Sequence, residues 1–515
     1  MKLKLFTWLF FVFVILYATA LHTAATFNDP DSFYHARITE LMIEKRGILT
    51  EFPWLPFTAF SQSFIDHHLA YHLFLIPFIA LWGGVWGIKV ATVVAFVAVI
   101  AAVYALLAHL LSSRTNPKRQ MIVLLFTASL FFNDIFILRM NLEKIPAVSL
   151  LWLLGGTYAI LAGKRRLVFF FSFFFVWLHG AWPLLPILAL LYWLADRGSR
   201  HSFAIAAATS VLGASAGLII NPYFPQNISF YFVQIFQVAV VTYDNLFEVG
   251  SEWYPAGANI IAWGTGATML SVVATVVFVF KKAFAKGTAG LSHRTSAERF
   301  FFLATLMFFL LTLKSSRHGE YFVPFATIFG ALVVTPFLET RSTAYVKKLL
   351  LAYYQKKRLA AVIIAAFFAA YLLITPLKSV FYLITFRVGI PVEKHRYTAK
   401  WLQENTPPGS IIFNDRWGYF PSLWFWGEHN RFIAGLDPTF FYSRDPELFW
   451  RYEALRNGAI QKGAARSIQK KFGVNVIIVS KENSALRAVL NRDPDASLAY
   501  EDGSGAIFTV STPRP

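Results

Sequence analysis

Long apolar runs alternate with short polar loops from the N-terminus to residue 376. The runs lie at residues 5–21, 85–111, 120–138, 145–162, 167–180, 183–195, 202–220, 259–280, 300–313, 319–338 and 359–376. Stretches of this kind are typical of helices that cross the hydrocarbon core of a bilayer. The pattern therefore predicts a polytopic α-helical membrane protein with about eleven transmembrane helices.

Lysine and arginine are concentrated in the loops between these runs. The basic groups are Arg114/Lys118/Arg119, Lys164/Arg165/Arg166, Arg197/Arg200, Lys281/Lys282/Lys286/Arg294/Arg299 and the segment 341–358. The positive-inside rule places such loops in the cytoplasm. A further apolar run at 68–82 is short for a span, and counting it as one would place the basic loop 112–120 outside. We therefore predict that 68–82 lies along the outer interface.

This choice puts every basic loop inside and leaves the large outer segments 22–84, 221–258 and 377–515. The run 5–21 is either an uncleaved first helix or a signal peptide with Ala18-Thr19-Ala20 before the cleavage site. We favour the uncleaved helix because the chain stays apolar after it. Both alternatives place residue 22 onward outside.

Residues 377–515 lose the apolar character of the preceding chain. A helical pattern at 397–402 is ended by Pro407-Pro408-Gly409, and strand patterns follow at 410–413, 474–479 and 506–510. This segment is predicted to be a small soluble α/β domain outside the membrane. The chain thus divides into a transmembrane domain, 1–376, and an extracytoplasmic domain, 377–515.

The composition agrees with this division. Of the 515 residues, 57% are apolar and only 15% are charged, which is too little charge for a soluble protein of this length. The formal charge of +19 would suit nucleic-acid binding, but the position of the cations in short loops excludes that class. The absence of cysteine excludes disulfides and thiolate metal sites.

Acidic side chains stand at the outer ends of the apolar runs. Asp29 and Asp31 lie in the first outer loop, Asn141 and Glu143 follow the run 120–138, and Glu252 lies in outer loop 221–258. Charges this close to the hydrocarbon cost free energy and tend to be paired or functional. Convergence of these side chains would make an oxygen-rich site for Mg²⁺ or Mn²⁺.

Cations occupy the last of these outer turns. Arg317 and His318 lie in the turn 314–318, and the planar fork of an arginine suits a phosphate group. A divalent ion beside an arginine at the bilayer surface is what a reaction that expels a lipid-linked phosphate needs.

Each of these residues also has a purely structural interpretation. A single interfacial acid is usually solvated, and Arg139 with Glu143, four residues apart, fits a helix salt bridge. His67, His68 and His72 fit interfacial polar residues better than metal ligands. The acids indicate a site only as a set on one face of the bundle.

Four stretches resemble the GT-C-type membrane glycosyltransferases, and within them the catalytic subunit of oligosaccharyltransferase. Residues 31–37 are similar to the first-loop acid motif of that family, and residues 141–143 to its second-loop motif. Residues 251–255 are similar to its mobile outer-loop motif. Residues 414–419 are similar to its Trp-Trp-Asp-Tyr-Gly signature, which follows a strand in the outer domain.

The resemblance implies a metal-dependent, inverting transfer of a sugar or oligosaccharide from a polyprenyl phosphate or pyrophosphate to an acceptor on the outer face of the inner or plasma membrane. It implies that Asp31 and Glu252 act in catalysis and that Asp31, Asn141, Glu143 and Glu252 bind Mg²⁺ or Mn²⁺. It implies that Arg317 and His318 bind the donor phosphate and that Asp415, Trp417 and Tyr419 bind the acceptor. Asp29, His35 and Asp66 are secondary candidates for the site. Its partners would be the donor, the acceptor and membrane lipids, with no nucleic acid.

The sequence departs from the oligosaccharyltransferase pattern at three positions. Phe413 and Asn414 stand where the signature has two tryptophans, and Asn141 stands where an acid is expected. The acceptor is therefore open: a protein, including its asparagine, an envelope lipid or a glycan. Two classes without transfer chemistry also remain, a transporter of lipid-linked substrates and a non-catalytic scaffold. Clustered outer acids and the lack of an internal repeat favour the transferase over the transporter.

Overall fold

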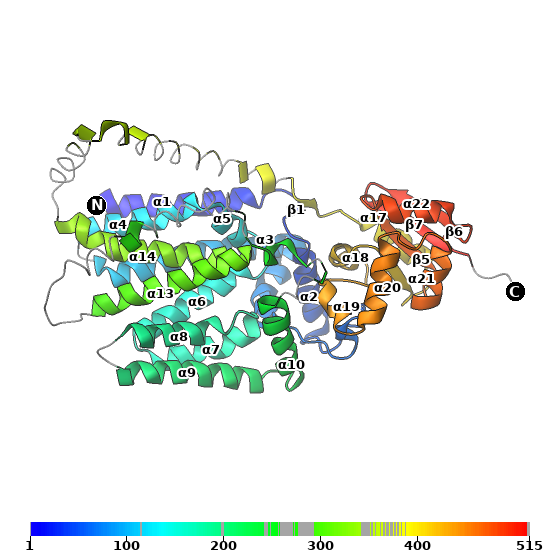
Figure 1. Ribbon diagram of the computed structural model, residues 1–515, viewed down its shortest axis with the longest axis horizontal. Coiled ribbons are helices and arrows are strands. Elements are labelled where there is room, and N and C mark those ends of the chain that lie inside the picture. The colour runs from blue at the N-terminus through cyan, green and yellow to red at the C-terminus, as the bar shows by residue number, and fades with distance from the viewer. Residues whose placement is uncertain are drawn as a thin grey trace. The chain divides into compact units, whose positions relative to one another are not determined.

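The computed structural model describes a largely helical chain with one substantial sheet near its C-terminus (Figure 1). The described residues are 2–113, 116–196, 200–241, 246–247, 249–255, 257, 271, 273–276, 293–340 and 388–511, with scattered positions between 351 and 386. The predicted spans 259–280 and 359–376 lie largely outside these residues. The chain separates into two compact units, which are described one at a time.

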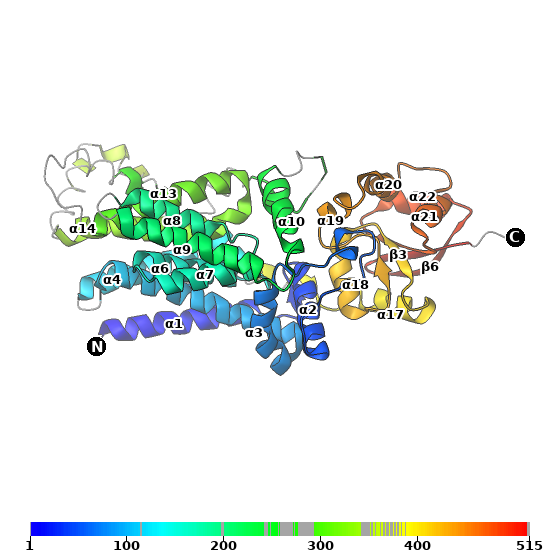
Figure 2. The same ribbon diagram turned by 90° about the horizontal axis from the view of Figure 1, so that it is seen from below.

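The first unit contains residues Met1–Ala24, Val90–Ile220 and Ser251–Arg387. Its helices are α1 (Lys2–Leu21), the second part of α3 (Leu69–Leu110), α4 (Pro117–Ala128), α5 (Asp134–Met140), α6 (Pro146–Leu161), α7 (Arg165–Leu178), α8 (Leu184–Ala195), α9 (Arg200–Ile219), α13 (His293–Lys314) and α14 (Gly319–Thr340). Figures 1 and 2 show the longer of these side by side with roughly aligned axes. They form a helical bundle.

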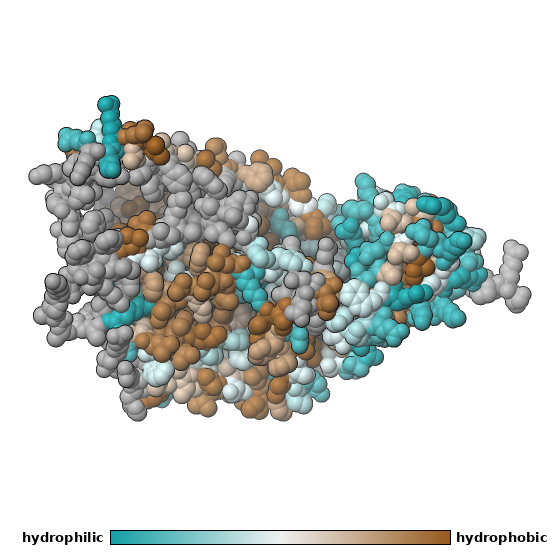
Figure 3. Space-filling view, viewed as in Figure 1, coloured by the Kyte–Doolittle hydropathy of each residue, from teal (hydrophilic) through white to brown (hydrophobic). Residues whose placement is uncertain are grey.

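The bundle has the surface of a membrane protein. Large apolar side chains of α1 point away from the protein, including Trp8 at 63% and Leu16 at 64% exposure. Figure 3 shows hydrophobic residues spread over the bundle and hydrophilic residues over the C-terminal elements. A soluble surface rarely carries apolar patches of this extent, whereas lipid tails accommodate them. Among the described residues, four helices are long and apolar enough to cross a membrane.

Those four helices are Leu3–Leu21, Leu69–Leu110, Ser296–Lys314 and Ser316–Pro336. Three shorter apolar helices accompany them, Pro146–Leu161, Leu184–Ala195 and Ala204–Ile219. The membrane bundle that the sequence predicts is therefore present. The predicted number of eleven spans is not established by these helices.

The predicted span 120–138 is not one continuous helix. Helix α4 ends at Ala128, a 3₁₀ turn follows (η3, Ser129–Phe132), and α5 begins at Asp134. Asn133 between them has an extended backbone, and its amide donates hydrogen bonds to the carbonyls of Ser129 and Leu130. An asparagine side chain that binds the backbone in this way competes with helical hydrogen bonds and interrupts the helix.

The sequence places a break between the runs 68–82 and 85–111, and the structure has one there. Helix α3 extends from Leu69 to Leu110 but leaves helical geometry at Gly83, which has φ 72° and ψ 172°. This conformation is essentially restricted to glycine. The segment before it belongs to the second unit, and the apolar segment from Val90 onward belongs to the first.

The second unit contains residues Ala25–Lys89, Asn221–Gly250 and Val388–Pro515. Its elements before residue 388 are β1 (Thr26–Phe27), α2 (Asp31–Lys45), η1 (Ala59–Ser61), the first part of α3, α10 (Gln226–Phe232) and the π-helical segment η4 (Val233–Val240). Strand β1 pairs antiparallel with β2 (Ile390–Pro391), so residues distant in sequence close the unit.

A sheet of five described strands forms the C-terminal part of this unit, in the order β4-β3-β5-β7-β6. The strands are β3 (Ile411–Asn414), β4 (Arg431–Phe432), β5 (Val476–Ser480), β6 (Ala496–Asp502) and β7 (Gly505–Val510). The helices around it are α17 (Arg396–Asn405), α18 (Phe420–Trp426), α19 (Pro438–Tyr442), α20 (Pro446–Arg456), α21 (Ala464–Phe472) and α22 (Ser484–Arg492). Strand β3 is parallel to both neighbours, and the β5–β7 and β6–β7 pairs are antiparallel.

The three predicted strands of this domain correspond to β3, β5 and β7. Every residue of β5 is buried, as expected for a strand covered on both faces. Strands β4 and β6 were not predicted. Strand β4 has two residues, and β6 is mostly exposed and carries no apolar run.

The first outer loop packs on the C-terminal elements of the same unit. Trp54 donates its indole N–H to the carbonyl of Glu428 at 2.9 Å, and its own carbonyl accepts from the backbone N–H of Phe432 at 2.8 Å. Its ring lies 5.0 Å from that of Trp424, which is fully buried. The core of the second unit therefore combines residues from both ends of the chain.

Candidate active site

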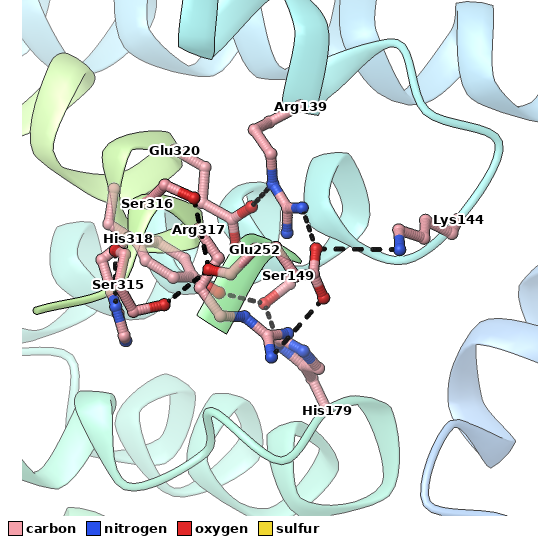
Figure 4. Close-up of polar contacts among 11 residues, drawn as sticks. Arg139, Lys144, Ser149, His179, Glu252, Ser315, Ser316, Arg317, His318 and Glu320 are labelled. Atoms are coloured by element: carbon pink, nitrogen blue, oxygen red, sulfur yellow. Dashed lines mark hydrogen bonds and ion pairs between the residues drawn. The ribbon is translucent and has the colours of Figure 1, made fainter. Parts of the chain in front are cut away.

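A dense cluster of charged side chains lies where α5 ends and α14 begins in the first unit (Figure 4). Glu252, in the 3₁₀ turn η6 (Ser251–Trp253), stands at its centre. Its Oε2 contacts the Nη1 of Arg139 in a short ion pair and lies 3.8 Å from the Nζ of Lys144. Its Oε1 lies 3.8 Å from the Nη1 of Arg317. One carboxylate thus faces three cations.

A second carboxylate fixes the central arginine. Glu320, in the first turn of α14, accepts a 2.8 Å hydrogen bond from the Nε of Arg139 and is fully buried. Its Oε1 accepts no hydrogen bond from any described residue. Arg139 therefore links the end of α5 to the beginning of α14 and presents its terminal nitrogens to Glu252.

The turn that carries Glu252 is held against the turn that carries Arg317. Ser315 and Ser316 both donate their hydroxyls to the carbonyl of Glu252, at 2.8 and 3.2 Å. The guanidinium of Arg317, in η7 (Ser316–His318), lies 4.1 Å from the centre of the Trp253 ring, a cation–π contact. These contacts position both the carboxylate and the cation.

The electrostatic environment keeps Glu252 ionised. Burial alone would raise its pKa, but the charges of Lys144, Arg139 and Arg317 outweigh burial and hold the pKa well below its usual range. Glu252 is therefore a carboxylate anion throughout the physiological pH range.

A chain of buried polar groups lies beside the charged cluster (Figure 4). Ser149 of α6 shares hydrogen bonds with the Nδ1 of His179 at 2.9 Å and with the hydroxyl of Tyr321 at 3.0 Å, and all three residues are buried. Ser149, His179 and Glu320 are not among the site residues that the sequence predicts. The one signal for His179 is its place directly after the apolar helix α7, where a polar side chain is unusual.

Glu143 has a different partner from the one that helix spacing suggests. Its Oε1 lies 3.0 Å from the Nδ1 of His22, and both side chains are almost completely buried. Arg139, the alternative partner, binds Glu252 and Glu320 instead. Asn141 donates to the carbonyl of Ile137 at 2.8 Å, while its buried Oδ1 receives no hydrogen bond from the described residues.

These side chains fit the predicted divalent ion only in part. The buried Oδ1 of Asn141 and the carboxylate of Glu143 are hard oxygen donors of the kind that Mg²⁺ and Mn²⁺ prefer. Glu252 does not fit as their co-ligand in this arrangement, because three cations surround it. Within the described part of the chain, no three His, Asp or Glu side chains are grouped as a metal site.

Asp31 belongs to the second unit, where it is the first residue of α2 and is half-buried. Asp29 accepts a 2.9 Å hydrogen bond from the backbone N–H of Asp31 and so orders the start of this helix.

Two of the secondary candidates form a buried hydrogen-bonded series in the same unit. The Oδ2 of Asp66 lies 2.7 Å from the Nδ1 of His72, whose Nε2 lies 2.8 Å from the Nδ1 of His35. His72 is fully buried among these partners. His67 and His68 are half-buried.

The candidate acceptor residues lie after β3 in the C-terminal part of the second unit. Asp415 is buried and accepts hydrogen bonds from the backbone and hydroxyl of Ser480 and from Asn483, while burial raises its pKa. Trp417 and Tyr419 lie in the 3₁₀ turn η8 (Trp417–Tyr419), and the Tyr419 hydroxyl donates to Glu482 at 2.6 Å. Asp415 thus connects the ends of β3 and β5.

No protein-family model matches the chain, and no curated protein matches its sequence. Solved structures do match. The oligosaccharyltransferase AglB from the archaeon Archaeoglobus fulgidus, in complex with an inhibitory peptide and a dolichol-phosphate, matches with a TM-score of 0.61 and 12% identity, over 91% of this chain and 69% of that one. ArnT from Cupriavidus metallidurans, bound to undecaprenyl phosphate, matches with a TM-score of 0.56 and 14% identity, over 97% of both chains. The chain has the GT-C fold.

A further match has the same fold in a much longer protein. The arabinofuranosyltransferase AftD from Mycobacteria matches with a TM-score of 0.55 and 13% identity, over 98% of this chain and 39% of that one. The GT-C fold and the resemblance inferred from the sequence therefore agree. The apolar helices and this fold together identify a membrane-embedded protein.

Proposed function

We propose that this protein is a membrane glycosyltransferase that moves a sugar or oligosaccharide from a polyprenyl phosphate or pyrophosphate to an acceptor outside the cytoplasm, with inversion at the sugar carbon. The observation that carries the proposal is the cluster of Arg139, Lys144 and Arg317 at one end of a GT-C bundle. A lipid-linked donor places its phosphate at the membrane surface, where such cations would bind it.

The solved structures with this fold support a donor of this class. AglB was solved with a dolichol-phosphate and ArnT with undecaprenyl phosphate, and both ligands are polyprenyl phosphates. A structure of the Archaeoglobus fulgidus oligosaccharyltransferase contains zinc and sulfate. By analogy, the present chain would bind a polyprenyl-linked donor in the inner or plasma membrane, with its C-terminal domain outside.

In this proposal Asp31 activates or orients the acceptor, and Arg317 with His318 binds the donor phosphate. A Mg²⁺ or Mn²⁺ ion held by Asp31, Asn141 and Glu143 would offset the negative charge that develops on the departing phosphate. The fixed cations of the chain serve the same purpose, because charges placed in advance stabilise a developing anion without reorganisation.

A second acceptor class is favoured by a specific observation. Asn414 is fully buried and donates its amide to the carbonyls of Ala434 and Arg416, and Phe413 is fully buried in the core. These positions stand where oligosaccharyltransferases carry two tryptophans, and here they are packing residues. Transfer of a single sugar to an envelope lipid or glycan is therefore the alternative to transfer to protein asparagine. Asp415, Trp417 and Tyr419 remain the proposed acceptor contacts in both cases.

Transfer assays on purified protein in lipid nanodiscs test the proposal. Polyprenyl-phosphate and polyprenyl-pyrophosphate sugars are supplied, and release of the lipid phosphate is measured. Asp31→Ala and Glu252→Ala are expected to lower transfer by about 10²-fold or more, the usual effect of removing a group that acts in the transition state. Glu51→Ala is the matched control, because it removes an exposed acid from outer loop 22–84, which also contains Asp31. Full transfer in both variants would contradict the assignment of the site.

Manganese binding gives a separate measurement. Electron paramagnetic resonance should detect Mn²⁺ bound to the wild-type protein and little or none bound to Asp31→Ala. Mn²⁺ binding that is indifferent to Asp31 would remove this residue from the proposed ligand set.

A further inference from the structure

The three cations of the site are fixed, whereas their central carboxylate is on a more accessible element. The side chains of Arg139, Lys144 and Arg317 are 7%, 9% and 18% exposed, and that of Glu252 is 27% exposed. Arg139 is anchored from behind by the fully buried Glu320. Glu252 lies in a 3₁₀ turn of three residues outside the helices of the bundle. Of the five charged side chains, Glu252 is therefore the one that can move out of the cluster with the least disturbance of the bundle.

Two of the three cations hold Glu252 only loosely. The Nζ of Lys144 and the Nη1 of Arg317 both lie 3.8 Å from its carboxylate, which is longer than a hydrogen bond. The two oxygens of a planar carboxylate cannot approach three separate cations equally well. The pyrophosphate of a lipid-linked donor has non-bridging oxygens on both phosphorus atoms, so its oxygens can be directed toward all three cations.

The charges also match a phosphate. Counted over these five described side chains alone, Arg139, Lys144 and Arg317 contribute +3 and Glu252 and Glu320 contribute −2, a formal charge of +1. Without Glu252 the charge is +3 − 1 = +2. A pyrophosphate esterified to a lipid and a sugar carries one negative charge on each phosphate, about −2 in total, which this site would neutralise. The monoester that a released lipid phosphate forms carries about −1.5 to −2 near neutral pH.

We propose that Arg139, Lys144 and Arg317 form a single anion site, and that Glu252 fills it as an internal anion until the phosphate of the donor displaces it. The proposal extends the proposed function, because it assigns Arg139 and Lys144 to the donor and gives Glu252 a second position. Donor binding then releases the Glu252 carboxylate from the three cations. Glu252 would join the residues that act on the acceptor only after the donor is bound.

Anion binding to purified, full-length protein tests this directly. The probes are inorganic phosphate and farnesyl phosphate, measured by isothermal titration calorimetry. Glu252→Gln removes the internal competitor while keeping the shape of the side chain. Its Kd for the anion is expected to fall by about tenfold or more, because an occupied site weakens the apparent affinity by its open fraction.

Glu320→Gln is the matched control for charge. It changes the net charge of the cluster by the same amount as Glu252→Gln, but Glu320 anchors Arg139 and does not occupy the anion site. Its Kd is expected to stay unchanged or to rise. Addition of Arg317→Gln to Glu252→Gln should abolish the gain in affinity. An equal gain in both glutamine variants would reduce the effect to net charge and overturn the proposal.

The wild-type protein provides a measurement that does not depend on any variant of Glu252 folding. Fluorine-19 NMR of protein labelled with 5-fluorotryptophan, with the Trp253 signal assigned by Trp253→Phe, reports on the turn next to Glu252. Either phosphate probe should shift this signal. A Trp253 signal that stays in place while phosphate binds would show that Glu252 is not displaced.

The two probes and the transfer assay separate the outcomes. A higher affinity of Glu252→Gln for both probes supports a phosphate site that needs no lipid. A higher affinity for farnesyl phosphate alone supports a site for lipid-linked phosphate. Tight binding to Glu252→Gln, with no transfer by the wild-type protein from any donor, would retain the anion site and contradict the transferase. An unchanged or weaker affinity of Glu252→Gln for both probes overturns the anion site, whether or not the wild-type protein transfers sugar.

Discussion

Glu252 illustrates how the partners of a side chain decide its chemistry. Its position beside apolar runs and in a motif-like turn indicates a functional acid, and the sequence suggests a metal ligand. In the folded protein the nearest charges are those of Arg139, Lys144 and Arg317. A carboxylate in that environment is bound as an anion, which makes it a competitor of phosphate more readily than a ligand of a cation.

The depressed pKa of Glu252 predicts a specific dependence of stability on pH. Its pKa in the folded state lies below the unfolded value of about 4.3, so its ion pairs stabilise the fold fully above that value and are lost as the pH falls through the folded pKa. Glu252→Gln should lower the unfolding free energy by about 1–3 kcal/mol at pH 7, because it leaves charged groups without their partner.

Thermal unfolding in detergent measures this effect. The difference in Tm between wild type and Glu252→Gln should be constant from pH 6 to 8 and should shrink as the pH falls below about 4. Glu44→Gln, which removes an exposed partner of Arg37, is the control and should change Tm little at any pH. A difference that grows on acidification would contradict the ion-pair arrangement around Glu252.

The candidate residues could be located from the sequence, but their partners could not. Asp31, Glu143, Glu252 and Arg317 are visible because charges at the ends of apolar runs are rare and costly. The pairs that determine the electrostatic environment of these side chains join residues far apart in the chain. His22 and Glu143 are 121 positions apart, and Arg139 and Glu320 are 181 positions apart. Helix spacing could suggest only the local alternative, Arg139 with Glu143, because packing selects the distant partner.

At the scale of elements, hydrophobic patterning predicted the long helices and the buried strands well. It failed where a polar side chain acts on the backbone, as at Asn133, whose amide binds the carbonyls of Ser129 and Leu130 and separates α4 from α5. It also missed β6, because an exposed edge strand has no apolar periodicity to detect. The limits of the apolar runs 68–82 and 85–111, in contrast, predicted the break in α3 at Gly83.

Gly83 gives a clean test of that break. Its φ of 72° and ψ of 172° lie in a region that is essentially restricted to glycine, and no described heavy atom lies within 4 Å of an added Cβ. Gly83→Ala should therefore destabilise the protein by backbone strain alone, by about 1–3 kcal/mol. The measurement is Tm in detergent. Gly47→Ala is the matched control, because its φ is not left-handed and its nearest atom lies at 3.9 Å. Equal stability of the two variants would show that α3 is not broken at Gly83.

At the scale of the whole molecule, the sequence predicted a membrane bundle followed by a soluble domain beginning at residue 377. In the structure, residues 388–515 form one compact unit together with residues 25–89 and 221–250. Trp54 and Trp424, which are 370 positions apart (424 − 54), lie in contact in its core. Composition changes along the chain reveal where apolar runs stop, but they do not show which outer loops fold together, since that depends on aromatic contacts between distant segments.

The orientation of the chain in the membrane remains a prediction, and the absence of cysteine makes it simple to test. Lys118, Lys164 and Lys470 are exposed and can each be replaced by cysteine in an otherwise cysteine-free protein. In sealed right-side-out vesicles, a membrane-impermeant maleimide should label Lys470→Cys at once. It should label Lys118→Cys and Lys164→Cys only after permeabilisation, because basic loops stay in the cytoplasm. If residues 68–82 cross the membrane, every later segment changes side, and the labelling pattern of all three variants is reversed. That result would also place the C-terminal domain in the cytoplasm, where it could not meet an acceptor outside the cell.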